Sequence, residues 1–137
     1  MADYERIPGP DFHARERLKR DVLADPPPFR VLLAEMDGKV VAYSLYFFTY
    51  SSFLARPSLY VEDLFVLPEA RQHGIAMSLM KEMAREAVRR GCGRMEWTVL
   101  YWNEPAVAFY EGLGARIHDE WRVVRLTGEK LEKLAEA

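Results

Sequence analysis

The sequence contains only one cysteine, Cys92, so an internal disulfide bond is excluded. No apolar run approaches the roughly 20 residues that a membrane-spanning helix needs, and the first residues, MADYERIPGPDF, lack the apolar core of a secretory signal. Neither sign of charge dominates: 19 basic and 21 acidic residues leave a net charge of −2, which creates no overall field toward nucleic acid or an anionic membrane. These absences predict a cytoplasmic protein that binds neither nucleic acid nor a membrane. Any anion that it binds must therefore be held by a local group of residues.

The length and the apolar content favour one compact domain. The chain has 137 residues, of which 50% are hydrophobic, which is enough for one core and too short for two ordinary domains. No repeat, low-complexity segment or linker divides the sequence. We therefore expect a single domain over residues 1–137.

The first third of the chain predicts a helix followed by a β-hairpin. Residues 11–24 form a polar, weakly amphipathic pattern that ends at a run of three prolines. Two β-rich runs then predict strands near 30–36 and 39–50. Between them stands Asp37-Gly38, a pair that readily adopts the positive φ angles of a tight hairpin turn.

The middle of the chain predicts a strand that leads into a helix. Residues 59–67 are almost continuously apolar, which is typical of a strand covered on both faces, except for Glu62 and Asp63. The strongest helical periodicity follows and ends in two arginines and Gly91, a C-capping glycine. The apolar positions of this helix are Ile75, Ala76, Leu79, Met80, Met83, Ala84, Ala87 and Val88.

The last third of the chain predicts two further strands around a short helix. Residues 94–100 and 115–126 have strand-like patterns, and residues 103–114 have the pattern of a helix that Asn103 opens and two glycines close. A strand, a helix and another strand in this order imply a parallel crossover. The predicted fold class is therefore α/β.

The segment RQHGIA, residues 71–76, has the composition of an anion-binding corner at the start of the long helix. A helix N-terminus carries unpaired N–H groups and about half a positive charge. With Arg71 beside it and Gly74 letting a ligand approach the backbone, the corner can hold a diphosphate. Alternatively, Gly74 only relieves a tight turn and Arg71 is solvated. The spacing matches neither the Gly-x-x-x-x-Gly-Lys-Ser/Thr phosphate loop nor the Gly-x-Gly-x-x-Gly dinucleotide turn.

RQHGIA resembles the Arg/Gln-x-x-Gly-x-Gly/Ala signature of the GNAT acyltransferase superfamily. The resemblance covers residues 25–135 and includes the segments YFFTY, LYVEDLFVLPEARQHGI, WNEPAVAFYEGLGA and EWRVVRL. In this order they are similar to the diamine (spermidine/spermine) and thialysine acetyltransferase branch. The resemblance implies the α/β GNAT fold, with a mixed central sheet and flanking helices, and acetyl-CoA as co-substrate.

In this family the corner binds the pyrophosphate of acetyl-CoA, and the backbone of the preceding strand hydrogen-bonds the pantetheine arm and polarises the thioester carbonyl. The resemblance also implies that Asn103 contacts the cofactor, although Asn103 can equally be the N-cap of its helix, and the two roles can coexist. The implied cofactor-binding residues are Leu64, Phe65, Val66, Arg71, Gln72, His73, Gly74, Ile75, Ala76, Asn103 and Tyr110.

The same resemblance implies a general acid and a base for the attack of an amine on a thioester. Tyr110 is similar to the acid near the sulfur, and a phenol is protonated at neutral pH and can donate; alternatively, it is a packing residue. Glu62 is similar to the residue that deprotonates the amine through water, and Asp63 to one that holds a substrate cation. Both acids can instead lie in water at an edge or a bulge, and without a bulge they face opposite sides of the strand.

Two tryptophans complete the residues that the resemblance singles out. Trp102 and Trp121 match aromatic positions of the family's substrate and dimer region, where a ring face can attract an ammonium, although core packing accounts for them as well. Because the related enzymes form intertwined pairs, we expect a homodimer, for which the apolar segment around Trp121 suits an interface.

Metal-dependent and covalent chemistry are not predicted. The three histidines, His13, His73 and His118, are scattered and show no metal-ligand spacing. Cys92, in RRGCGR, has no basic partner that would make its thiol a nucleophile. We therefore assign no metal and no covalent intermediate.

The sequence departs from the family pattern in three places. Related enzymes begin with a further strand that this sequence does not show, so an edge of the 30–36 strand is expected to be unpaired unless the N-terminal segment, a partner chain or a bulge covers it. The polyamine enzymes have a motif that resembles Asp-Pro-Trp, whereas this chain has Ser51, Ser52 and Phe53, which argues against a long polycation. Glu111 stands where those enzymes tend to have a basic residue.

Together, the residues and the resemblance predict an N-acetyltransferase. It would transfer an acetyl group from acetyl-CoA to a primary amine of a small molecule, namely a diamine, a polyamine or a lysine-like amino acid, by direct attack in a ternary complex. Two alternatives stay open. The acceptor can be an amine of a protein or of an antibiotic, or the chain can be a non-catalytic acyl-CoA-binding homodimer.

Overall fold

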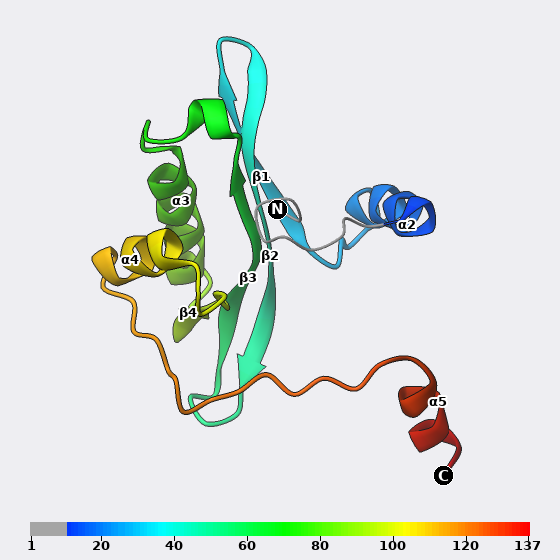
Figure 1. Cartoon of the computed structure of the whole chain (residues 1–137). Coiled ribbons are helices and arrows are strands. Elements are labelled where there is room, and N and C mark those ends of the chain that lie inside the picture. Colours follow the sequence, from blue (N-terminus) through cyan, green and yellow to red (C-terminus); the bar gives the residue numbers. More distant parts are fainter. Residues whose placement is uncertain (1–10) are drawn as a thin grey trace. The chain divides into compact units, whose positions relative to one another are not determined.

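The computed structural model describes residues 11–137 (Figure 1). The chain divides into two compact units, one ending at Leu100 and the other spanning Tyr101–Ala137, and each is described by itself. The expectation that the family's first strand is missing falls partly on residues 1–10, which lie outside the described residues.

The first described element is α2, Phe12–Val22, which confirms the helix predicted over 11–24. The side chain of Asp11 accepts a hydrogen bond from the backbone N–H of Ala14 at 2.8 Å. This cap satisfies one of the N–H groups that lack a partner at the start of a helix. No residue of α2 is buried, so local capping supports this helix more than packing does.

The predicted hairpin is confirmed. β1, Arg30–Met36, pairs antiparallel with β2, Lys39–Ser51. At the tip, Asp37 and Gly38 have φ angles of 52° and 78°. Two consecutive positive φ angles are the mark of a primed turn, whose twist matches that of the flanking strands, so the local sequence alone accounts for this connection.

The four strands form one mixed sheet in the order β1-β2-β3-β4. β3, Arg56–Val66, pairs antiparallel with β2, and β4, Arg94–Glu96, pairs parallel with β3. The crossover between them passes through the short 3-10 helix η1, Pro68–Ala70, and through α3, Ile75–Arg89, which lies along one face of the sheet (Figure 1). The predicted α/β fold class is confirmed.

A β-bulge interrupts β3 at Glu62. Leu45 lies opposite Asp63, and the next residue of β2, Tyr46, lies opposite Val61. Glu62 is therefore an extra residue without a cross-strand partner. A bulge bends the strand that carries it and shifts the alternation of side chains beyond it.

β4 is shorter than the strand predicted over 94–100. Its three pairs with β3 end at Tyr60 and Glu96, two residues before the bulge. Because β3 bends at the bulge, a regular ladder with β4 does not continue beyond this point. Residues 97–100 therefore follow β4 without forming a strand.

α3 packs on the sheet through one stripe and ends in a Schellman motif. Gly91 has a φ of 71° and its N–H donates to the carbonyl of Val88, while the N–H of Cys92 donates to that of Ala87. Val88 is 80% exposed, so its prediction as an apolar face position was wrong: it lies on the solvent side of the helix. The buried residues of α3 are Leu79, Met80, Met83 and Ala87.

The core contains a hydroxyl that its surroundings do not satisfy. Ser44 on β2 is 0% exposed, and its Oγ has no hydrogen-bond partner within the described part of the chain. A buried hydroxyl without a partner retains the cost of its desolvation. Ser44 therefore lowers the stability of the sheet that it helps to build.

We expect Ser44→Ala to raise the free energy of unfolding by about 1 kcal/mol, because the unsatisfied hydroxyl is removed at little loss of packing. Urea unfolding measures the change. Ser51→Ala is the matched control, because Ser51 is also buried but its Oγ accepts a hydrogen bond from the N–H of Leu54 at 3.1 Å. That variant should lose stability, and a loss of similar size in Ser44→Ala would contradict the prediction.

The second unit contains two helices and an extended connection. α4, Glu104–Gly112, confirms the predicted short helix, and α5, Gly128–Glu136, is the tail helix. The prediction of a strand over residues 115–126 was wrong, because no part of this segment pairs with a strand in the structure as described. An alternating pattern specifies which side chains would share a face, but a strand also needs a neighbouring strand to pair with. Residues 101–137 contain no strand.

Candidate functional site

The end of β3 and the start of α3 form the corner that the sequence singled out. α3 begins after Gly74, which has a φ of 75°. No side chain caps this helix start, its first turn contains no acidic residue, and a Cβ placed on Gly74 would meet no atom within 4 Å among the described residues. An uncapped start of a 15-residue helix with open space beside its N-cap glycine is the geometry of an anion site.

Arg71 joins this corner to the strand. Its Nε donates a hydrogen bond to the backbone carbonyl of Val66 at 3.0 Å. Its guanidinium also lies 5.9 Å from the centre of the Phe65 ring, within the range of a cation–π contact. Arg71 is thus held against the end of β3, three residues before Gly74, where α3 begins.

Gln72 and His73 shape the turn between them. Gln72 has a φ of 66°, a left-handed conformation that non-glycine residues adopt uncommonly. Nδ1 of His73 lies 3.1 Å from the carbonyl oxygen of Ala70 and 2.9 Å from that of Arg71, so it donates to the backbone of the turn. Both residues hold the loop in the shape that exposes the start of α3.

The second half of β3 borders this corner. β4 pairs with β3 only over residues 58–60, so no described strand pairs with this edge of β3 at Leu64, Phe65 and Val66. The hydrogen bond between Arg71 and Val66 shows that these strand residues and the corner lie together. The structure thus brings the predicted strand and corner residues of the first unit into one place.

The bulge separates the two acids of β3. Glu62 is the extra residue and is exposed, which matches the alternative of a bulge that leaves this carboxylate in water. Asp63 is partly buried and lies opposite Leu45. Tyr46 contacts Glu86 of α3, and because alternate residues of a strand face opposite sides, Leu45 and Asp63 lie on the face away from α3.

Two aromatic pairs flank Asp63 on that face. The rings of Tyr43 and Phe65 are 6.3 Å apart, and those of Phe47 and Tyr60 are 5.3 Å apart. Each pair joins directly opposite residues of β2 and β3, on either side of the pair formed by Asp63. A carboxylate between aromatic rings is an environment that suits an ammonium group.

The remaining predicted residues belong to the second unit. Asn103 is buried and caps α4, because its side chain accepts a hydrogen bond from the N–H of Ala106 at 3.4 Å. Tyr110 follows seven residues later, about two helical turns, and is partly buried, with its ring 5.5 Å from that of Phe109. Trp102 is 39% exposed and Trp121 is 79% exposed, so neither is a core residue.

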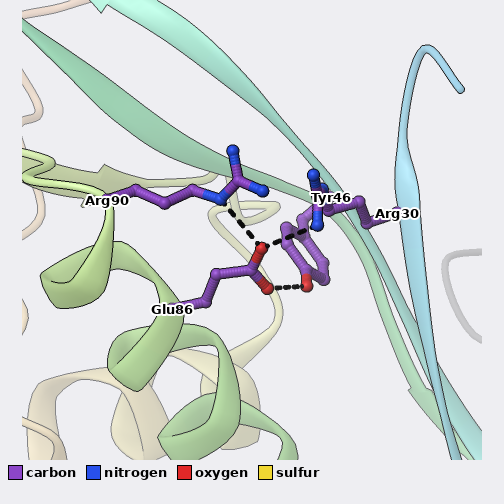
Figure 2. A network of polar contacts seen from close by, with 4 residues as sticks. All are labelled: Arg30, Tyr46, Glu86 and Arg90. Atoms are coloured by element: carbon purple, nitrogen blue, oxygen red, sulfur yellow. Dashed lines mark hydrogen bonds and ion pairs between the residues drawn. The ribbon is translucent and has the colours of Figure 1, made fainter. Parts of the chain in front are cut away.

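A polar network at the other end of α3 was missed at the sequence level (Figure 2). The carboxylate of Glu86 accepts hydrogen bonds from the hydroxyl of Tyr46 and from Nε of Arg90 at 3.1 Å, and it pairs with a guanidinium nitrogen of Arg30 at 3.1 Å. A signal was present, because Glu86 follows Met83 by three residues, in step with the apolar stripe of the helix. An acid in such a position indicates a buried polar contact.

The pKa of Tyr46 is raised from 10.0 to about 12. Burial of the phenol is the largest cause, and the hydrogen bond to Glu86 is the second. Because the folded pKa exceeds the unfolded one, the contribution of the neutral phenol to stability is fully present below pH 10 and is lost as the pH rises toward 12. We therefore expect the difference in unfolding free energy between the parent chain and Tyr46→Phe to shrink between pH 10 and 12. Urea unfolding across this range measures it, and a constant difference would contradict the expectation.

Other classes of site find no support in residues 11–137. There, no group of three or more His, Cys, Asp or Glu side chains could hold a metal ion, and no helix is long and apolar enough to cross a membrane. Burial raises the pKa of the Cys92 thiol, which disfavours the reactive thiolate.

A model of the acetyltransferase (GNAT) family matches residues 2–115. The L-ornithine N5-acetyltransferase of Arabidopsis thaliana is 40% identical over 113 residues, which cover 82% of this chain and 50% of that protein. The thialysine N-epsilon-acetyltransferase of Sus scrofa is 35% identical over 146 aligned positions, which cover 98% of this chain and 85% of that protein. The chain thus spans half the length of the first relative and most of the second.

A solved structure with a similar fold is an integron cassette protein from the mobile metagenome of V. cholerae. It superposes with a TM-score of 0.82 at 29% sequence identity, over 94% of this chain and 80% of that one.

Proposed function

Because the chain belongs to the GNAT acetyltransferase family, we propose that it transfers an acetyl group from acetyl-CoA to a primary amine of a small molecule. The family, the thialysine branch and the fold that the sequence indicated are confirmed. The observation that carries the proposal is the open, uncapped start of α3 at Gly74, directly beside the bent end of β3.

The residues of this corner fit the diphosphate of acetyl-CoA. The N–H groups at the start of α3, together with the positive charge of Arg71, would bind the phosphates, and Gly74 lets them approach the backbone. The pantetheine arm is an extended chain with two amides, and the β3 edge at Leu64–Val66 offers backbone groups for such a partner. Asn103 and Tyr110 of α4 would contribute further contacts to the cofactor.

The acceptor is proposed to be a small cationic amine, such as a diamine or a lysine-like amino acid. Asp63 between two aromatic pairs is suited to an ammonium group at the far end of the acceptor. The relatives in Arabidopsis and Sus scrofa are named for ornithine and thialysine, both of which are amino acids with a terminal amine. Trp102 and Trp121, which are at least partly exposed, are proposed as further contacts to the acceptor.

The proposed reaction is a direct attack in a ternary complex. Bound acetyl-CoA supplies an activated acyl group. Glu62, exposed at the bulge, would take a proton from the acceptor ammonium through a water molecule, so that the nitrogen can form a bond to the acyl carbon. A backbone N–H of the Leu64–Val66 segment would stabilise the charge on the carbonyl oxygen. Tyr110 would give its proton to the thiolate as the carbon–sulfur bond breaks.

Three expectations from the sequence stay predictions. The single domain over residues 1–137 is supported by a family match that runs from residue 2 to residue 115 and so includes parts of both units. The homodimer and the cytoplasmic location are the other two. Sedimentation at micromolar concentration would test the dimer.

The test of the function is the release of free thiol from acetyl-CoA with a panel of acceptors. The panel contains diamines, ornithine, thialysine, spermidine and lysine peptides, each beside an analogue whose amine is tertiary and cannot form a stable amide. Release that requires the primary amine supports the proposal, and the preferred acceptor identifies its class. Acetyl-CoA that raises the melting temperature without any release would overturn catalysis and favour an acyl-CoA-binding protein.

A further inference from the structure

Glu86 lies at the opposite end of α3 from the proposed cofactor corner. It follows Gly74 by 12 positions, which corresponds to about 18 Å along a helix. At that distance the side chain of Glu86 does not contact the corner itself. Any effect of Glu86 on that corner must act through the position of the helix itself.

The contacts of Glu86 fix the helix to two different strands. The side chain of Glu86 is only 13% exposed and it contacts Arg30 of β1 and Tyr46 of β2 (Figure 2). Arg90, one turn further along α3, contacts the same carboxylate. A nearly buried carboxylate that three groups satisfy is strongly directional, because each hydrogen bond depends on both distance and angle.

An aromatic ring beneath the network holds the two arginines. The guanidinium of Arg90 lies 4.7 Å from the centre of the Phe48 ring, and that of Arg30 lies 5.8 Å from it. Two cations are thus gathered around one carboxylate and one ring. If the carboxylate lost its charge, the two guanidinium groups would repel each other and the network would rearrange.

The other contacts of α3 are less restrictive. The buried residues that precede Glu86 on the helix are Leu79, Met80 and Met83, which are apolar and unbranched at Cβ. Apolar contacts are non-directional, and methionine in particular adapts to altered surroundings. The apolar contacts hold the helix against the sheet, but they resist small shifts along the helix axis and small rotations about it less strongly than the polar network does.

We infer that Glu86 is a positioning residue that sets where the N-terminus of α3 lies relative to the end of β3, and thereby tunes the binding of the diphosphate of acetyl-CoA. α3 is one uninterrupted helix, so a shift at Glu86 is transmitted to Gly74. The inference rests on the proposed function for the identity of the ligand. It adds to the proposed cofactor site a residue that would affect binding without contacting the ligand.

The test compares two acetyl donors in the Glu86→Gln variant. Acetyl-CoA contains the diphosphate, whereas S-acetylpantetheine has the same thioester and lacks it. We expect kcat/KM for acetyl-CoA to fall about tenfold, mainly through KM, because a charged hydrogen bond to the diphosphate is weakened. The value for S-acetylpantetheine should stay within twofold of that of the parent chain. The CoA dissociation constant, measured by calorimetry, should rise by a similar factor.

Glu82→Gln is the matched control, because Glu82 lies one turn earlier on α3 and pairs with Arg85 at the exposed surface. It should leave both donors unaffected. Tyr46→Phe, which keeps the carboxylate and removes one contact, should shift the acetyl-CoA value in the same direction by less, and it provides a milder variant if Glu86→Gln unfolds. Equal losses for both donors, or a lower melting temperature with an unchanged CoA dissociation constant, would overturn the inference.

The same experiment separates the inference from the proposed function. A parent chain that binds CoA but releases no thiol would overturn the acetyl transfer alone, and the CoA dissociation constants of the variants would still decide the role of Glu86. A parent chain that binds no CoA would overturn both.

Discussion

Replacing Tyr110 by phenylalanine should lower kcat for acetyl transfer by about 100-fold or more while leaving the affinity for acetyl-CoA nearly unchanged. A positioned general acid contributes roughly 10²–10⁴ to a rate, and phenylalanine keeps the ring but has no proton to donate. The ring of Tyr110 packs beside that of Phe109, a contact that phenylalanine retains. The loss should therefore appear in the chemical step and not in folding.

Stopped-flow or continuous thiol assays give kcat, and calorimetry gives the dissociation constant of CoA. Tyr101→Phe is the matched control, since it removes the same hydroxyl from a side chain of the same unit that is 92% exposed, and its kcat should match that of the parent chain. A Tyr110→Phe variant with parental kcat would exclude Tyr110 as the acid.

Gly74→Ala should weaken acetyl-CoA binding at least tenfold. In the free protein the added methyl group meets no described atom within 4 Å, so it creates no clash. It would occupy the space through which a phosphate approaches the first N–H groups of α3, and each charged hydrogen bond lost there is worth roughly 1.5–3 kcal/mol. The positive φ of 75° adds a strain of about 1–2 kcal/mol to the folded state.

Gly91→Ala separates strain from ligand binding. Gly91 lies just after the other end of α3, has a φ of 71°, and a Cβ there also meets no described atom within 4 Å. Both variants should lose similar stability in urea unfolding, but only Gly74→Ala should raise the CoA dissociation constant. Equal CoA affinity in the two variants would show that phosphate does not approach the backbone at Gly74.

Elements governed by neighbouring residues were predictable from the sequence. The turn at Asp37 and Gly38, the cap of α4 by Asn103 and the glycine after α3 depend on the backbone preferences of one or two residues. The corner at residues 71–76 was predictable for the same reason, since its glycine and arginine precede a strongly periodic helix.

Features that depend on pairing between distant segments were not predictable. The bulge at Glu62 exists only relative to the register of β2, so the pattern of β3 alone does not place it. The strand predicted over 115–126 lacks a partner within its unit. The Glu86 network needs Arg30 and Tyr46, which are contributed by β1 and β2. The position of Glu86 on the apolar stripe of α3 indicated a buried polar contact, but the pattern did not identify its partners.

Because of the bulge, the side chains of β3 alternate between the two faces of the sheet in one order before Glu62 and in the opposite order after it. Before Glu62, the odd-numbered residues Leu59 and Val61 face α3, whereas beyond it the even-numbered residues Leu64 and Val66 do, because each lies opposite an even-numbered residue of β2. If one odd-or-even rule is applied to the whole of β3, the residues on one side of the bulge are therefore assigned to the wrong face of the sheet. Any library of substitutions along β3 should be divided at Glu62, with the inward and outward positions exchanged on its two sides.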